Sequence, residues 1–118
     1  MHPFRMDIES ADDVVVVTLF GEIDIDCRAR MQAGLRSVVE ADKVVIDLRQ
    51  VTFIDSSGLG MFARARAACA ERDGSMALCP GPPNVMRAFH MAGMTELFEQ
   101  LDEPAQALRP PPSSEPEA

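Results

Sequence analysis

The sequence predicts one α/β domain built as two layers, a mixed central β-sheet with helices packed mainly on one face. Two strand-like segments joined by a short turn open the chain, which is typical of an antiparallel hairpin. A continuously apolar VVIDL segment at 44–48 then favours a buried parallel strand. Amphipathic helical segments separate the later strands, as expected where helices cover a sheet. With 118 residues and 47% hydrophobic content, the chain can bury one core.

The opening hairpin follows from hydrophobic spacing. Alternating apolar and charged residues predict a strand over 4–9. The β-branched run at 14–20 predicts its antiparallel partner, and we expect Gly21 to end that second strand.

The later strands are shorter and more apolar. Residues 43–48 and 75–79 suit the interior of a sheet, while 49–54 is expected to be a loop. For 97–101, a short edge strand and a helical turn fit the pattern equally well.

Three helices are expected between and after these strands. Apolar residues at helical spacing over 27–38 predict a first helix from residue 26, capped by Asp24 or Asp26. The alanine-rich stretch 59–72 predicts a second helix. A turn with two prolines then starts a third helix, which ends near Gly93.

One domain is expected to span residues 1–108. The last ten residues, 109–118, are rich in Pro, Ser and Glu. Such a segment buries too little apolar surface to offset its chain entropy, so we predict that it is disordered.

Charge and cysteine content argue against several classes of function. A net charge of −8 disfavours nucleic acid, whose phosphates bind Lys and Arg. Cys27, Cys69 and Cys79 form no CxxC pair, and His2 and His90 lie at no ligand spacing, so no disulfide framework, metal site or cofactor is indicated. The cysteines are interpreted as small buried hydrophobes. The N-terminal segment lacks a signal-peptide core and VVVVTLF is too short to span a bilayer, which predicts a cytoplasmic protein without membrane contact.

The segment DSSGLG at 55–60 is the strongest candidate for a functional site. It places Ser56 at the N-cap of a helix or next to it, where unpaired N–H groups and the helix dipole favour an oxygen ligand. Gly58 and Gly60 would let another surface approach the backbone closely. Taken alone, the segment is also compatible with a simple serine cap and a glycine turn.

Three further positions are interpreted as structural. Asp47 lies inside the apolar VVIDL strand, and a buried carboxylate needs a partner. Phe53 and Ile54 are assigned to packing that fixes the loop before the helix.

The string IDSSGLG after an apolar strand, together with GEIDID at 21–26, resembles the STAS domain of bacterial anti-sigma factor antagonists. The resemblance covers roughly residues 4–108 and includes the hairpin, the VVIDL strand and VMRAFHMAGMTELF, which is expected as a final helix. It implies a STAS-like fold. The residues after GEID, which are Ile25 to Arg28, depart from the small residues usual in the family.

The resemblance also implies a function. Family members bind an anti-sigma factor, usually a serine kinase of the histidine-kinase-like ATPase fold, and so release the sigma factor. The kinase phosphorylates the serine directly after the Asp, which is Ser56 here, with Ser57 as the alternative, and a metal-dependent serine phosphatase restores the active form. The implied partner-binding residues are Asp24, Asp55, Ser56, Ser57, Gly58, Leu59 and Gly60.

Two other functions are weighed against this one. A hydrolase with Ser56 as nucleophile would need Gly at position 54, where the chain has Ile, and only His90 could act as base, so no catalytic residue is predicted. The alternative within the same fold is a scaffold of a signalling complex, or a transporter accessory, whose serine is never modified. The free-standing length and the lack of a membrane span favour the antagonist.

Overall fold

The structure is a computed structural model that describes residues 2–108, and the segment predicted to be disordered lies outside the described residues. Its strands are β1 (Arg5–Ala11), β2 (Val14–Ile23), β3 (Lys43–Ile54), β4 (Ser75–Cys79) and β5 (Glu99–Gln100). Its helices are α1 (Arg28–Val38), α2 (Ser56–Glu71), α3 (Pro83–Met91) and α4 (Ala105–Leu108), with two 3₁₀ turns, η1 (Ile25–Cys27) and η2 (Thr95–Leu97).

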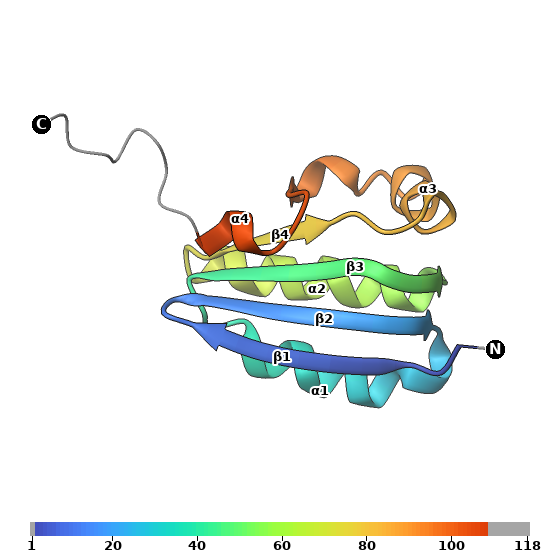
Figure 1. Cartoon of the computed structure of the whole chain (residues 1–118), viewed down its shortest axis with the longest axis horizontal. Helices are drawn as coiled ribbons and strands as arrows, with labels where there is room; N and C mark the ends of the chain where they lie inside the picture. Colours follow the sequence, from blue (N-terminus) through green and yellow to red (C-terminus); the bar gives the residue numbers. More distant parts are fainter. Residues whose placement is uncertain (1, 109–118) are drawn as a thin grey trace, which may run out of the picture.

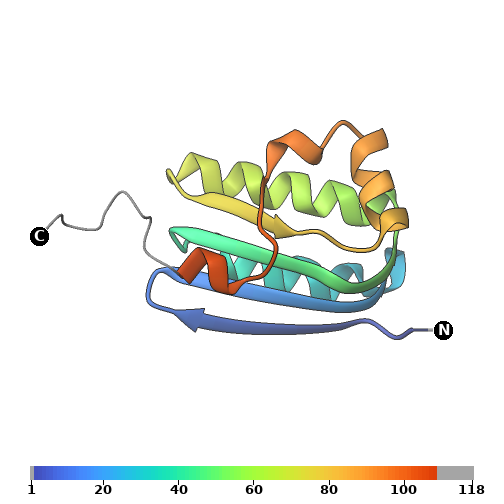
Figure 2. The same cartoon turned by 45° about the horizontal axis from the view of Figure 1, so that its top comes forward.

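The five strands form one mixed sheet in the order β1-β2-β3-β4-β5. β1 and β2 pair as the expected antiparallel hairpin, and every later neighbour is parallel. Figure 1 shows α1 and α2 side by side behind the sheet, while the short α4 lies on the opposite face. The turned view in Figure 2 keeps this arrangement. The prediction of a mixed sheet with helices mainly on one face is confirmed.

The core lies between the sheet and its helical layer. Residues alternate along β3, so Val44 and Ile46 face the helices and belong to the main core cluster. Phe89 of α3 is fully buried. Its ring stacks on Phe62 with centroids 5.8 Å apart and meets Phe98 edge-on at 6.1 Å. These three rings join α2, α3 and the segment before β5.

Two strands are longer than predicted. β2 does not end at Gly21 but continues to Ile23, with Gly21 at a positive φ of 83° that suits glycine. A β-carbon at Gly21 would collide with the Pro3 carbonyl oxygen. β3 continues to Ile54, so the loop expected at 49–54 is a strand paired with β2. This extension carries both strands to the edge where α2 begins.

The region after β4 combines two expected elements. α3 begins with Pro83 as its first residue, as predicted, and Gly93 at φ 72° follows its end. VMRAFHMAGMTELF is therefore not one helix, because the chain turns before η2. Both alternatives for 97–101 occur in succession, since η2 ends at Leu97 and β5 follows.

Asp47 is buried, with 4% of its surface exposed, and it has the partner that a buried carboxylate needs. Arg49 donates from Nε to Oδ1 at 3.0 Å and from Nη2 to Oδ2 at 2.9 Å. The carboxylate raises the pKa of the Arg49 guanidinium further. The structural interpretation of Asp47 is confirmed by this two-point contact.

All three cysteines are buried and unpaired, as predicted. Burial raises the pKa of each thiol, in Cys79 to about 11, where the carboxylate of Asp47 adds to the shift. At neutral pH these thiols are protonated and behave as small apolar groups.

Candidate functional site

Two aspartates lie side by side where β2 and β3 end. Ile23 and Ile54 are paired in the parallel ladder, and the Asp55 N–H donates to the Ile23 carbonyl at 3.1 Å. Asp24 and Asp55 follow these two residues directly. In a parallel pair the carboxyl ends of both strands meet at one edge of the sheet, and Figure 1 shows the ends of β2 and β3 together there.

Each aspartate caps the helical turn that follows it. Asp24 Oδ1 accepts from the Asp26 N–H at 3.0 Å and so caps η1. Asp55 is the N-cap of α2, and its Oδ1 accepts from the N–H groups of Ser57 at 3.0 Å and Gly58 at 3.2 Å. The expected cap role of Asp24 is confirmed for η1, and Ser56 is the neighbour of the N-cap, as the first residue of α2.

The two candidate serines differ in what surrounds them. The Ser57 hydroxyl is half-buried and donates to Asp55 Oδ1 at 2.6 Å, so it belongs to the helix cap. Ser56 is exposed, and its hydroxyl forms no hydrogen bond to any residue in 2–108. A group added to the Ser56 hydroxyl would therefore break no hydrogen bond of the fold, whereas one added to the Ser57 hydroxyl would replace its bond to Asp55 and lie against that carboxylate.

The next three residues of the motif have different surroundings. Gly58 is buried, and a β-carbon there would lie 2.7 Å from Ile23 Cγ2 and 2.9 Å from Ile54 Cγ1. The surface that approaches the backbone closely at Gly58 is therefore the sheet of the same domain. Leu59 packs against the core, half-buried, and a β-carbon on Gly60 would meet only the Arg64 side chain.

We expect Gly58→Ala and Gly60→Ala to change stability in opposite directions. Gly60→Ala should stabilise the domain by up to about 1 kcal/mol, since alanine favours the helix and only a flexible arginine must move. Gly58→Ala should destabilise it by about 1–2 kcal/mol, because overpacking against two isoleucines exceeds the same helical gain. Urea unfolding of both variants checks the sign, and a stabilised Gly58→Ala would contradict the packing role.

Two apolar side chains lie exposed beside this edge. Ile25 follows Asp24 and is 57% exposed, and Phe53 precedes Ile54 and is 46% exposed. Ile54 packs in the core as predicted, but the assignment of Phe53 to packing is wrong, because neighbouring residues of a strand face opposite sides. Sequence reasoning did not include Ile25 or Phe53 among the partner contacts. Exposed apolar groups around a polar centre are typical of protein contact surfaces.

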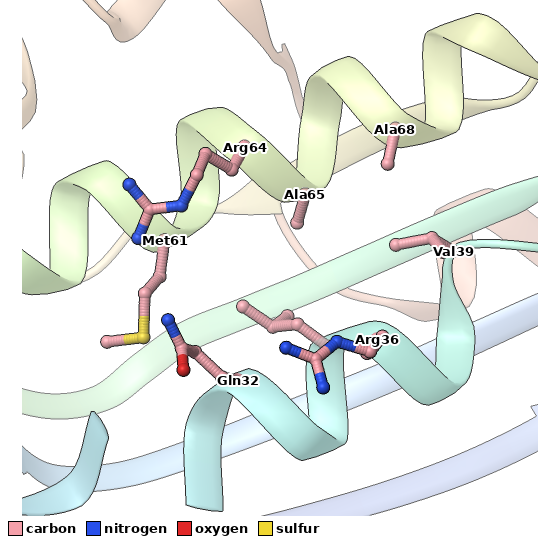
Figure 3. A pocket seen from close by; sticks show the side chains of 8 residues that line it. Gln32, Arg36, Val39, Met61, Arg64, Ala65 and Ala68 are labelled. Atoms are coloured by element: carbon pink, nitrogen blue, oxygen red, sulfur yellow. The ribbon is translucent and has the colours of Figure 1, made fainter. Parts of the chain in front are cut away.

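The helical layer next to the site is basic, in contrast to the chain as a whole. α1 carries no acidic side chain, and α2 carries only Glu71 at its last position. Figure 3 shows the hollow between the two helices, with Arg36 on the α1 side and Arg64 on the α2 side. The hollow has a volume of about 220 Å³ and is lined in part by the apolar side chains of Leu35 and Met61.

No cluster of three or more His, Cys, Asp or Glu side chains within 2–108 could hold a metal ion. Among the same residues, no helix has the length and apolarity needed to cross a bilayer.

Comparison with known proteins identifies the family. The model of the STAS domain matches residues 5–107, so the chain belongs to the STAS domain family. An anti-sigma F factor antagonist of Paenibacillus polymyxa is 26% identical over 107 residues, which cover 88% of this chain and 92% of that protein. These matches confirm the resemblance noted in the sequence.

Solved structures show the same fold. An anti-sigma factor antagonist from Mycobacterium paratuberculosis superimposes with a TM-score of 0.80 at 27% identity, over 90% of this chain and 92% of that one. The anti-sigma factor antagonist SpoIIAA, at 20% identity, matches 90% of this chain in both its unphosphorylated and its phosphorylated form. The TM-score is 0.76 for the unphosphorylated form, with 93% of that chain covered, and 0.69 for the phosphorylated form, with 96% covered.

Proposed function

We propose that this protein is an anti-sigma factor antagonist whose binding is switched off by phosphorylation of Ser56. In this proposal the unmodified form binds an anti-sigma factor that is also a serine kinase, and so frees the sigma factor. A metal-dependent serine phosphatase returns the modified form to the active state. Because its proposed partners belong to the transcription apparatus, we also propose that the protein acts in the cytoplasm. Its proposed role is to bind a partner, not to catalyse a reaction.

The observation that carries this proposal is the unengaged hydroxyl of Ser56. It is exposed at the first position of α2, next to a carboxylate that already caps the helix. A phosphate there would add about −1.5 to −2 charges without removing a hydrogen bond of the fold. The names of the relatives support the antagonist role, and one structure of the same fold is of SpoIIAA in its phosphorylated form.

The proposed docking surface comprises the predicted residues Asp24, Asp55, Ser56, Ser57, Leu59 and Gly60 and the exposed Ile25 and Phe53. Gly58, the remaining predicted residue, is buried and lets α2 lie close to the sheet beneath this surface. Asp24 and Asp55 already place two carboxylates at this edge, so a phosphate on Ser56 would add to an existing negative charge. A partner that docks over this edge would meet both the bulk of the phosphate and a stronger negative potential.

Incubation with candidate anti-sigma kinases and ATP, followed by mass spectrometry of the peptide that holds both serines, tests the proposal. We expect one phosphate on Ser56, none in Ser56→Ala, and an unchanged yield in Ser57→Ala. Addition to Ser57 alone would contradict the assignment. If no kinase of the host modifies the chain, the scaffold or transporter-accessory function gains instead.

A further inference from the structure

Arg64 lies in line with the proposed phosphorylation site. Ser56, Gly60 and Arg64 are spaced four residues apart in α2, which puts them on one stripe of the helix. Figure 3 shows the Arg64 side chain running along α2 toward Met61, and so toward the N-terminal end of the helix. Side chains of a helix lean in this direction.

The absence of a side chain at Gly60 leaves room for this guanidinium. Arg64 Nη1 lies 3.3 Å from the point where a β-carbon on Gly60 would sit. A helix rises ~1.5 Å per residue, so the guanidinium lies about one turn, or ~6 Å along the axis, from Ser56. Contact requires the phosphoryl group to turn back along α2 and Arg64 to extend further toward Ser56, and both side chains are exposed and free to change rotamer.

A phosphate on Ser56 would otherwise have few favourable partners. The N–H groups of Ser57 and Gly58 already donate to Asp55 Oδ1, so this helix start has lost two of the donors that commonly bind anions. The same carboxylate, together with Asp24, repels a dianion. Arg64 forms no ion pair with any residue in 2–108, which leaves its charge available.

We propose that Arg64 binds the phosphoryl oxygens of phosphorylated Ser56 within the same chain. The inference rests on the proposed function for the identity of the modified residue. A guanidinium offers a planar pair of N–H donors that matches two phosphate oxygens, and charge-assisted bonds of this kind are the stronger ones. Arg64 then holds the phosphate over the first turns of α2. Its role in this inference is confined to the phosphorylated state.

The test uses the whole chain with phosphoserine inserted at position 56 during translation, and ³¹P NMR measures the second pKa of the phosphate. A nearby cation favours the dianion and lowers this pKa. We expect it to be about half a unit lower in the unsubstituted chain than in Arg64→Gln, the size of an exposed ion pair. Arg64→Lys, which keeps the charge without the planar fork, should fall between the two.

Arg36→Gln is the matched control, because Arg36 is also exposed, borders the same hollow and forms no ion pair within the described residues. It should leave the pKa of the phosphate unchanged. Equal pKa values in the unsubstituted chain and Arg64→Gln would overturn the inference, as would an equal shift in Arg36→Gln, which would indicate a general field.

This result is independent of the proposed switch. Translational insertion needs no kinase, so the NMR comparison decides the role of Arg64 even if no kinase modifies Ser56. Conversely, a kinase that modifies Ser56 while Arg64→Gln leaves the pKa unchanged would retain the switch and remove only the arginine contact.

Discussion

Phosphorylated Ser56 is expected to weaken binding of the anti-sigma factor by at least about a hundredfold, since like charges and added bulk at an interface cost several kcal/mol and every 1.4 kcal/mol is tenfold. Ser56→Ala should bind within about twofold of the unmodified chain, because it removes no contact of the fold. Ser56→Asp should lie between these limits, as it adds about one charge where a phosphate adds up to about two. Calorimetric titration of each form with an anti-sigma kinase that modifies Ser56 measures all three.

The control for this experiment is the same modification at the opposite end of the sheet. Ser10 is exposed in β1 and pairs with Val15 next to the hairpin turn, which Figure 1 shows far from the start of α2. Phosphoserine at position 10 should leave the affinity unchanged. Equal loss at both positions would mean that net charge, not the docking edge, controls binding. Equal affinities of Ser56→Ala and Ser56→Asp would contradict the electrostatic part of the switch.

Phe89→Ala is expected to destabilise the domain by about 3–5 kcal/mol, the largest effect on folding that we predict. The Phe89 ring is fully buried and touches Phe62 on one side and Phe98 on the other. Its removal would leave a cavity where α2, α3 and the approach to β5 meet. Urea unfolding measures the loss, with the slope of the transition checking that unfolding stays two-state.

Met91→Ala, two residues further along α3, is the control for the Phe89 variant. Met91 is 77% exposed, so its truncation should change the free energy of unfolding by no more than about 0.5 kcal/mol. Similar losses in both variants would show that helix α3, and not the contact between the rings, sets the cost.

The length of β3 could not be predicted from spacing because the pairing with β2 is irregular. Register shifts occur between Thr18 and Phe20 and between Gly21 and Glu22, where β3 contributes an extra residue each time. The buried residues in this half of β3 are therefore Leu48, Val51 and Ile54, three apart, instead of every second residue. Because apolar residues three apart do not match the alternation typical of a strand, the sequence pattern predicted a loop here.

The candidate site was predicted from two levels of information. The residue types at the start of α2 predicted that unpaired N–H groups near Ser56 would favour an oxygen ligand. Aspartate is itself a preferred N-cap residue, so Asp55 could have been recognised as the side chain that supplies this oxygen. The closeness of Asp24 and Asp55 depends on the register of β2 against β3, which local patterns do not contain, so only the family resemblance suggested it. The exposure of Phe53 follows from the length of β3, because a strand that continues to Ile54 turns Phe53 and Ile54 to opposite sides.

The free hydroxyl of Ser56 has a consequence for how fast such a switch can respond. Asp55 and Ser57 hold the start of α2, while Ser56 contributes nothing to that arrangement among residues 2–108. In the proposed switch, adding or removing a phosphate at Ser56 would break none of these hydrogen bonds, so no refolding step is expected to slow the response. Repeated cycles of the proposed modification would therefore cost the domain none of the contacts that hold the start of α2.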